Sequence, residues 1–583
     1  MSALLAIALS GALQVAAKDN KPTPELRRRP GASTAQQNKP AQLPDPNRAS
    51  GLAAVPPAPP YGAPAVAPVP DRWRILETLK LLPTHLYDPY HQNTLKADRP
   101  IVGNDFFLNV SVISDTVYEP RRLPTPVGPQ STSTAGSVDI FGAGRQSLFS
   151  QSLIVGLTAI KGDTSFKPPE FELHLTPVFN YNYVWSREER LLQIDPREGR
   201  DREDHFLGVQ EAFVDVHLRN VSDRYDFDSF RVGVQPFSTD FRGFLFQDNQ
   251  LAARLFGTRA NNRYQYNLAY IRRLEKDTNS GLNDPTVQPR HDDFAVANFY
   301  AQDFPTPGFT SQLIGAWNRN RETRRFYNED GFLERPASFG SERPHTYDVG
   351  YLGYNGDGHF GRFNLTVSGY GVAGHESLGR FHDGPGQVLA GFAAAEGSMD
   401  FDWMRLRLSL LWASGDHDPF DDKATGYDAV FENPIFAGAD TNFWIRQSIP
   451  LIGGGGVALS TRNGVLADLR SSKDHGQSNF TNPGIELAGV GVDFDLLPQL
   501  RVSTNFNHLW FGDTAVLETA RNQEDIANDI GWDLSVATIW RPFMQQNIVL
   551  RLSGATLLPG QGMQDLYPHQ TLYSVLGNLI LAY

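Results

Sequence analysis

Long segments in which apolar and polar residues alternate constrain the fold of this chain more than any other feature. The longest covers residues 171–185, where Phe171, Leu173, Leu175, Phe179, Tyr181, Tyr183 and Trp185 alternate with Glu172, His174, Thr176, Asn180 and Asn182. A period of two is typical of a β-strand with one apolar and one polar face. The segment is longer than the roughly six residues usual for a soluble strand. Its apolar face ends in aromatic residues, as the strands of membrane β-barrels do.

Similar alternation recurs along most of the chain. Counting every such segment predicts strands near residues 105, 148, 171, 208, 229, 250, 263, 293, 310, 346, 360, 387, 402, 484, 500, 529, 547 and 572. About 18 strands is an even number, as expected for a bacterial outer-membrane barrel. The predicted fold is therefore all-β, a transmembrane antiparallel β-barrel of about 18 strands, preceded by a disordered Pro-rich N-terminal extension.

The connections between these strands give an independent indication of the same fold. Short links at residues 542–546, 497–499, 355–358 and 260–262 alternate with long ones at 514–528, 414–482, 321–345 and 276–291. Outer-membrane barrels join their strands by short periplasmic turns and long external loops. The alternation therefore predicts that both ends of the barrel lie in the periplasm.

The sequence before the barrel divides into three segments. Residues 1–17 form an apolar run that ends in small residues, which predicts a signal peptide; the alternative is a short buried helix. Residues 18–70 are rich in Pro, Ala, Gln and charge, which predicts a disordered periplasmic linker. Residues 71–104 are a lead-in segment with one short helix at 72–82, and the predicted barrel covers residues 105–583.

Composition limits the possible functions. After the signal, no segment approaches the roughly 18 consecutive apolar residues of a transmembrane helix. Mean hydropathy is −0.36, which is compatible with a barrel because lipid-facing and lumen-facing residues cancel in the average. The chain contains no Cys, which excludes disulfides and thiolate catalysis. A net charge of −13 argues against nucleic acid as a partner.

The last predicted strand ends at Tyr583, the final residue of the sequence. Tyr573, Val575, Leu579, Leu581 and Tyr583 alternate with Ser574, Asn578 and Ala582. This pattern resembles the C-terminal signal by which the barrel-assembly machinery recognises outer-membrane proteins. The expected partners are therefore that machinery, outer-membrane lipid and a small hydrophilic or polyanionic solute.

Several stretches resemble the alginate-export family of outer-membrane barrels. They are residues 210–216 (QEAFVDV), 230–237 (FRVGVQPF), the corner at 413–416 that leads into an Asp-rich loop, and residues 530–540. The resemblance covers much of residues 209–583 and implies an 18-stranded barrel with an Arg-rich lumen that conducts an anionic polysaccharide. The chain departs from the family in its Pro-rich extension, in its very long loop after Trp412, and in the acids that accompany the arginines.

The polar faces of the predicted strands carry arginines. Arg facing lipid at mid-depth costs about 2 to 4 kcal/mol, so these residues are expected to face the lumen. Arg suits a polyanion because its planar guanidinium binds carboxylates bidentately. Alternatively, the arginines pair with acids such as Glu170, Glu172, Glu211, Asp215, Asp348 and Asp533 and only stiffen the wall. The candidate lumen residues are Arg219, Arg231, Arg254, Arg362, Arg405, Arg407, Arg501 and Arg551.

The remaining motifs do not predict a metal site, a phosphate loop or a catalytic site. Asp416, Asp418, Asp421 and Asp422 could bind calcium, but the spacing does not match an EF-hand, and a solvated acidic loop is the simpler interpretation. Residues 453–456 are a Gly run without the Lys of a phosphate loop and favour a loop that folds over or into the pore. Neither the pair His375 and Glu376 nor His417 makes a metal or triad spacing. No enzyme activity, catalytic residue, metal or cofactor is predicted.

Three functions are compatible with these observations. The first is an outer-membrane pore for passive diffusion or export of a hydrophilic solute, including an anionic, polysaccharide-like one, with the loop at 414–482 as its constriction. The second is a plugged barrel that acts as an anchor or interaction protein through its periplasmic Pro-rich segment. The third is a secreted soluble β-protein that binds or hydrolyses glycans, which would not require detergent for extraction.

Overall fold

The computed structural model describes residue 79 and residues 93–125, 141–162, 168–222, 226–452, 457, 462–544, 546–567 and 570–583 of the 583-residue chain. The predicted signal peptide, the Pro-rich linker and the helix at 72–82, apart from Leu79, lie outside the described residues. So does the Gly run at 453–456.

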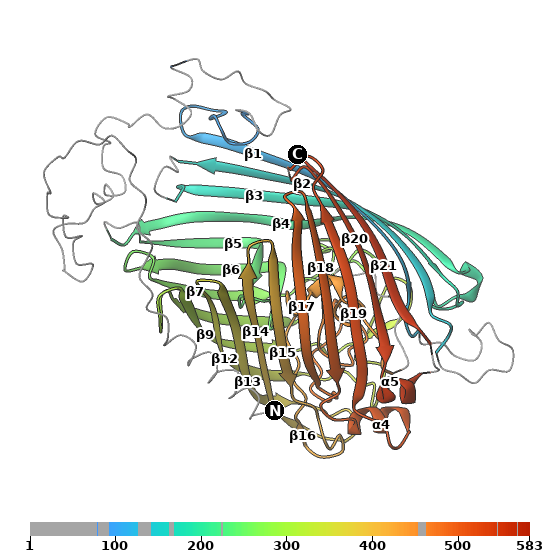
Figure 1. Cartoon of the computed structure of the whole chain (residues 1–583). Helices are drawn as coiled ribbons and strands as arrows, with labels where there is room; N and C mark the ends of the chain where they lie inside the picture. The colour runs from blue at the N-terminus through green and yellow to red at the C-terminus, as the bar shows by residue number, and fades with distance from the viewer. Residues whose placement is uncertain are drawn as a thin grey trace, which may run out of the picture. The chain divides into compact units, whose positions relative to one another are not determined.

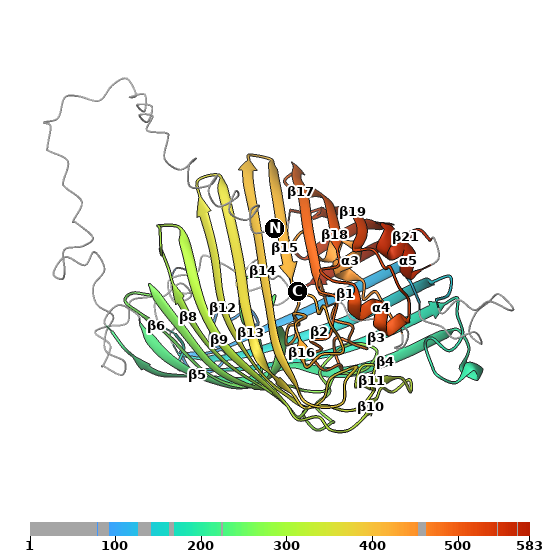
Figure 2. The ribbon, with the colours of Figure 1, turned by 90° about the horizontal axis from the view of Figure 1, so that it is seen from below.

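The described residues form a closed antiparallel β-barrel of 18 strands, because each strand pairs with the next and β21 pairs with β1. Figures 1 and 2 show these strands side by side around the barrel. They are β1 (Phe106–Arg122), β2 (Arg145–Lys161), β3 (Phe171–Ser186), β4 (Asp201–Asn220), β5 (Phe227–Ser238), β6 (Gln247–Arg259), β7 (Tyr264–Arg272), β8 (Asp292–Ala301), β9 (Phe309–Asn320), β12 (Tyr347–Phe360), β13 (Phe363–Glu376), β14 (Gly386–Phe401), β15 (Met404–Ala413), β17 (Ile485–Leu497), β18 (Leu500–Trp510), β19 (Asp529–Trp540), β20 (Ile548–Pro559) and β21 (Leu572–Ala582).

Short elements lie in the connections between these strands. They are η2 (Pro196–Glu198), β10 (Phe326–Tyr327), β11 (Leu333–Arg335), β16 (Lys423–Ala424), η3 (Ala439–Thr441), α3 (Phe443–Arg446), α4 (Ala515–Arg521) and α5 (Gln561–Leu566). β10 and β11 pair as a small hairpin, and β16 adds a short parallel pairing to β14. In the described part of the chain no helix is both long and apolar enough to span a membrane.

Each barrel strand has one exposed apolar face and one buried or polar face. On β15, Leu406, Leu408 and Trp412 are exposed, whereas Ser409 and Leu411 between them are buried. The same parity places Leu352 and Tyr354 of β12 on the outer face. The period of two in the sequence therefore becomes an apolar outer surface and a lumen lined by the polar set.

The predicted strands match the observed ones in number and position, and the all-β barrel fold is confirmed. One predicted turn is wrong: residues 355–358 do not form a turn but lie inside β12, which turns at residues 361–362. Gly356 and Gly358 are there to make room for the ring of Phe309, since a Cβ at either position would come within 2.4 Å of that ring. In the sequence these two glycines resemble a turn signal, but in the structure they allow close packing within a strand.

Short and long connections alternate around the barrel as predicted. Residues 260–263, 361–362, 402–403 and 498–499 are short turns at one end, and residues 273–291, 321–346, 414–484 and 511–528 are long loops at the other. Ala260, Asn261 and Asn262 have φ of 56 to 61°, a left-handed run that reverses the chain between β6 and β7. Residues 93–104 and Tyr583 lie at the short-turn end, where Tyr583 exchanges backbone hydrogen bonds with Val112.

The long loop at residues 414–484 is folded into the lumen. Its residues contact inward positions of β1, β6, β14, β18 and β19, which lie on different sides of the barrel, so the segment must lie between them. It carries its own buried apolar residues, including Val430, Phe431, Phe443 and Phe480, which join one hydrophobic cluster with wall residues such as Leu411. The barrel core is therefore made by a loop against the wall.

Candidate functional site

The lumen is the candidate site, and the predicted arginines can be placed in it. Arg231, Arg254, Arg405, Arg407, Arg501 and Arg551 take inward positions of their strands, and Arg362 lies in the turn between β12 and β13. Most of them are paired. Their nearest partners are Asp215 for Arg231, Asn267 for Arg254, Asp402 for Arg362, Asp400 for Arg405, Asp493 and Asn505 for Arg407, Asp495 for Arg501, and Asp440 for Arg551.

Arg219 does not face the lumen. The pairing of β4 with β5 shifts by one residue between His217 and Arg219, so a β-bulge moves Arg219 to the face of Asp228. Asp228 pairs in register with Gly257, on the same outer face as Val216 and Phe230. Strict alternation predicted the opposite face because a bulge reverses parity without leaving a clear mark in the sequence.

Arg254 and Arg231 lie next to each other on the inner faces of β6 and β5, where the strands pair them directly. Arg231 is bound to Asp215, with Nη2 2.7 Å from Oδ2. Arg254 donates from Nε to the neutral amide oxygen of Asn267 at 2.8 Å and lies over the ring of Phe256 at 4.6 Å. Among the described residues Arg254 has no carboxylate within ion-pair distance. This part of the wall therefore presents more positive than negative charge to the lumen.

The loop at 414–484 is attached to the wall through polar contacts at several points. Glu119 on β1 accepts from Nη2 of Arg446 at 3.0 Å and from Nε2 of Gln447 at 2.7 Å. On the far side, Arg462 donates from Nη2 to Asp248 of β6 at 2.7 Å. These charge-assisted contacts hold the loop in one position across the lumen.

Buried ion pairs also hold the loop together internally. Nη2 of Arg470 lies 2.6 Å from Asp428 Oδ1, and Nζ of Lys473 lies 2.6 Å from Asp468 Oδ2 and 2.7 Å from Glu432 Oε1. Burial opposes the charge of Arg470, but the nearby Asp428 and Asp468 carboxylates outweigh it and raise the pKa of the guanidinium. The network satisfies charges that would otherwise be costly in a buried loop.

Two neighbouring loops are tied to this segment. Arg290 donates to Glu322 from Nη2 at 2.9 Å and from Nη1 to the backbone oxygen of Asp474 at 3.0 Å. Arg335 pairs with Glu275 and donates to the backbone oxygen of His475 at 2.8 Å. Burial raises the pKa of Glu322, but Arg290 and Arg335 outweigh burial and hold that pKa at about 2. Residues 273–291, 321–346 and 414–484 thus form one connected assembly at the long-loop end.

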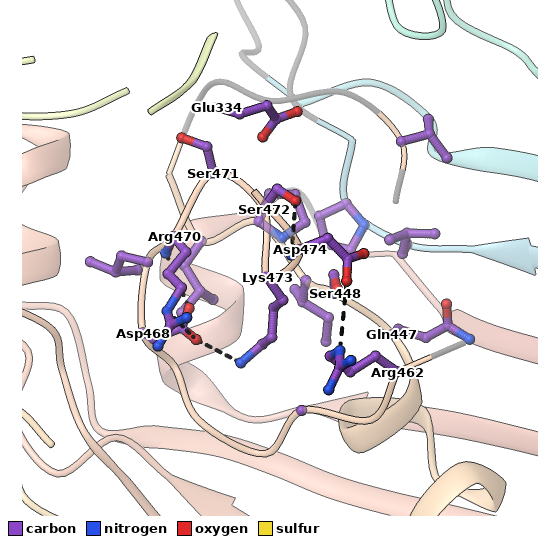
Figure 3. Close-up of a pocket in the computed structure, with 18 of the residues that line it drawn as sticks. Glu334, Gln447, Ser448, Arg462, Asp468, Arg470, Ser471, Ser472, Lys473 and Asp474 are labelled. Carbon is purple, nitrogen blue, oxygen red and sulfur yellow. Dashed lines mark hydrogen bonds and ion pairs between the residues drawn. The ribbon is translucent and has the colours of Figure 1, made fainter. Parts of the chain in front are cut away.

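A cavity of about 150 Å³ lies between the inner loop and the loop that carries β10 and β11. Figure 3 shows Glu334 on one side of it and Arg462 and Lys473 on the other. Lys473 is already bound to Asp468, and Nε of Arg462 lies 3.6 Å from Asp474 Oδ1. A volume of this size holds a molecule about as large as benzene, so the cavity is a small recess in the lumen.

The acidic run after β15 does not converge on a cation position. Asp416 Oδ1 accepts from Thr425, whereas Asp418 and Asp421 accept from nearby backbone N–H groups. Within the residues that the structure describes, no group of three or more His, Asp or Glu side chains could hold a metal ion. His375 and Glu376 are on opposite faces of β13: His375 is exposed outside and Glu376 is buried inside.

Sequence reasoning missed the charged residues of the inner assembly, such as Arg290, Arg335 and Arg470. All three lie in connections or in the small hairpin, where no period marks the buried positions. The only available signal was the length of the connection at 414–482 with its own apolar residues, which an external solvated loop would not need.

Comparison with known proteins gives similarity in structure alone. No protein-family model matches the chain, and no curated protein matches it. Among solved structures, Pseudomonas aeruginosa OccK2 (OpdF) is 13% identical, with 82% of this chain and 97% of that chain covered at a TM-score of 0.42. OpdK of the same organism, solved with vanillate, is 11% identical, with 82% and 98% covered at a TM-score of 0.44. OccK7 (OpdD), also from Pseudomonas aeruginosa, is 11% identical, with the same coverage and a TM-score of 0.46. The likeness to the alginate-export family stays a prediction.

Proposed function

We propose that this protein is an outer-membrane pore for passive diffusion of small hydrophilic solutes, with a preference for anions. The closed barrel with an apolar outer face suits a bilayer, because no strand edge is left unpaired. The observation that carries the anion preference is Arg254, an inward guanidinium without a carboxylate partner among the described residues. The folded loop at 414–484 restricts the path, so small solutes fit this lumen better than a polysaccharide. The predicted signal peptide, periplasmic linker and C-terminal assembly signal at Tyr583 belong to the same proposal.

The test is planar-bilayer conductance of the detergent-purified full chain under a salt gradient of potassium chloride. A pore of this kind gives steady single channels and a reversal potential that indicates chloride preference. Channels without anion preference would contradict the role of Arg254, and a barrel that inserts without conducting would contradict the pore itself.

A second candidate function, the plugged anchor, is favoured by one observation: the inner loop packs against the wall with a buried aromatic cluster. In that case the barrel stays closed, and residues 18–70 reach a partner in the periplasm. Deleting residues 18–70 separates the two, since a pore keeps its conductance and an anchor loses its partner.

A further inference from the structure

The outer face of the barrel carries a row of charged residues close to the long loops. Arg272 of β7, Asp293 of β8, Arg319 of β9, Asp348 of β12 and His375 of β13 follow one another in direct register. All five take the outer parity of their strands, of which Figure 1 labels β7, β9, β12 and β13 and Figure 2 labels β8 beside β9. Basic and acidic side chains alternate along the row, which crosses five neighbouring strands.

Two basic residues in this row, Arg319 and His375, have spare hydrogen-bond donors. Asp348 is bound to Arg321, so Arg319 Nε stays 3.9 Å and His375 Nε2 3.8 Å from its carboxylate. Among the described residues neither Arg319 nor His375 has a side-chain hydrogen bond. Their side chains are 48% and 71% exposed. Arg319 and His375 therefore flank Asp348 at ion-pair distance only, and their exposed N–H groups make no hydrogen bond among the described residues.

Directly below the row the outer face becomes apolar. Tyr270 and Trp317 precede Arg272 and Arg319 by two residues on the same outer faces, and both are exposed. Arg319 lies over the indole of Trp317 at 5.8 Å. Aromatic side chains of this kind mark the level of lipid headgroups in membrane proteins. Arg319 and His375 are thus placed at headgroup height.

Below His375 the outer face is a shallow trough of small residues. A Cβ added at Gly315 or Gly371 would meet no atom within 4 Å, and at Gly350 or Gly369 it would meet only backbone oxygens at 3.7 Å or more. None of these four residues has a positive φ. Glycine in a strand costs stability, yet neither the backbone nor internal packing requires it here.

Larger side chains border this trough. Leu352 on one side and Leu389 on the other are 73% and 66% exposed. Gly371 pairs with Leu352, and Ala373, the next outward residue on β13, pairs with Leu389, so small residues of β13 lead up to His375 between these two leucines. Such a surface accommodates a molecule that packs against the outside of the barrel.

We propose that this face binds a phosphorylated lipid of the leaflet beside the long loops, with a phosphate against Arg319 and His375 and an acyl chain over Gly350, Gly369 and Gly371. The inference rests on the proposed membrane location. Phosphate matches the site because it accepts several charge-assisted hydrogen bonds at once, and Arg binds it bidentately.

The experiment is native mass spectrometry of the full chain in detergent, with bis-phosphorylated lipid A as the probe and phosphatidylethanolamine as the comparison lipid. The wild type retains lipid A in preference to phosphatidylethanolamine. The double variant Arg319→Gln, His375→Gln loses about tenfold in lipid A retention, as expected for the loss of the hydrogen bonds that these two side chains donate to phosphate. Gly371→Leu weakens retention without removing charge, because it fills the trough.

Two matched controls keep lipid A bound. Arg263→Gln removes an arginine that lies over Tyr264 at the opposite rim, and Gly554→Leu adds a side chain at another glycine with open space around its Cβ. Equal retention by the Arg319 and His375 variant would overturn the proposal, as would equal retention of the two lipids by the wild type. Loss of an oligomer in Gly371→Leu with unchanged lipid A binding would overturn it too, in favour of a second copy of the chain. Conductance of the same variants is measured in parallel, so a failed pore is distinguished from a failed lipid site.

Discussion

Asp533 on the inner face of β19 accepts a hydrogen bond from the backbone N–H of Trp444 at 2.8 Å. A second bond comes from the N–H of Phe443, the first residue of α3, at 3.1 Å. A carboxylate of the wall therefore satisfies the free donors at the start of a helix in the loop, as a capping residue would. This contact attaches the loop at 414–484, which restricts the lumen, to the barrel wall. The position of the loop can therefore be tested by substituting Asp533.

Asp533→Ala is expected to release this end of the loop. The two N–H groups lose their acceptor, which costs about 1 to 2 kcal/mol of local stability. Single-channel recordings should show larger or noisier current, because the loop moves away from the wall. Asp529→Asn on the same strand is the control, since Asp529 binds His508 and not the loop. Unchanged conductance and noise in Asp533→Ala would mean that this contact does not hold the constriction.

Arg470→Met is expected to destabilise the inner loop strongly. It leaves the buried carboxylate of Asp428 without its partner, and breaking a buried pair in this way costs about 3 to 5 kcal/mol. Hydrogen exchange over residues 428–482 should rise in the variant. The double variant Arg470→Met, Asp428→Leu should recover part of the protection, because no unpaired charge remains. If the single and double variants exchange equally fast, the pair does not determine the stability of the loop.

The sequence could predict the barrel because lipid on one side and a polar lumen on the other impose a period of two on every strand. Residues 171–185 show that period most clearly, and the observed β3 covers the same segment. The prediction was wrong where a bulge reverses the inward and outward alternation of a strand and where glycines inside a strand resemble a turn. The bulge before Arg219 reverses the face, and Gly356 and Gly358 look like a turn although they make space for Phe309.

The inner loop could not be predicted in detail for a different reason. Its buried pairs, such as Arg470 with Asp428, join residues far apart in a segment without period. From the sequence alone, a charged side chain in such a segment is expected to be solvated. Only the tertiary structure shows that Arg290 and Arg335 from other loops bind the backbone of Asp474 and His475.

The local stability of the segment that follows β15 should depend on pH through Asp416. Burial raises the pKa of Asp416 from 3.8 to about 6, although hydrogen bonds from Thr425 lower it. The folded segment therefore holds a proton between about pH 4 and pH 6 that the unfolded segment releases. This contribution is fully present below about pH 4 and is lost as the pH rises through 6.

Asp416→Asn should remove this pH dependence, because an amide resembles the protonated acid and can still accept from Thr425. Limited proteolysis near residues 414–425 at pH 5 and pH 7.5 measures the effect. Asp418→Asn is the matched control, since Asp418 is exposed. A wild type that is cleaved more slowly at pH 7.5 than at pH 5 would have the opposite sign and would contradict the assignment.

Arg254 and Arg219 allow a direct test of which arginines the solute meets. Arg254 faces the lumen with a neutral partner, whereas the bulge in β4 places Arg219 outside, where it binds Asp228. Arg254→Gln should shift the reversal potential in a potassium chloride gradient toward cations, because it removes a positive charge from a narrow region of low dielectric constant. Arg219→Gln removes the same charge from the chain but should leave the reversal potential unchanged. If both variants shift it equally, selectivity follows the net charge of the protein and not the charge of the lumen wall. If only Arg219→Gln shifts it, the assignment of the two faces at this part of β4 and β6 is wrong.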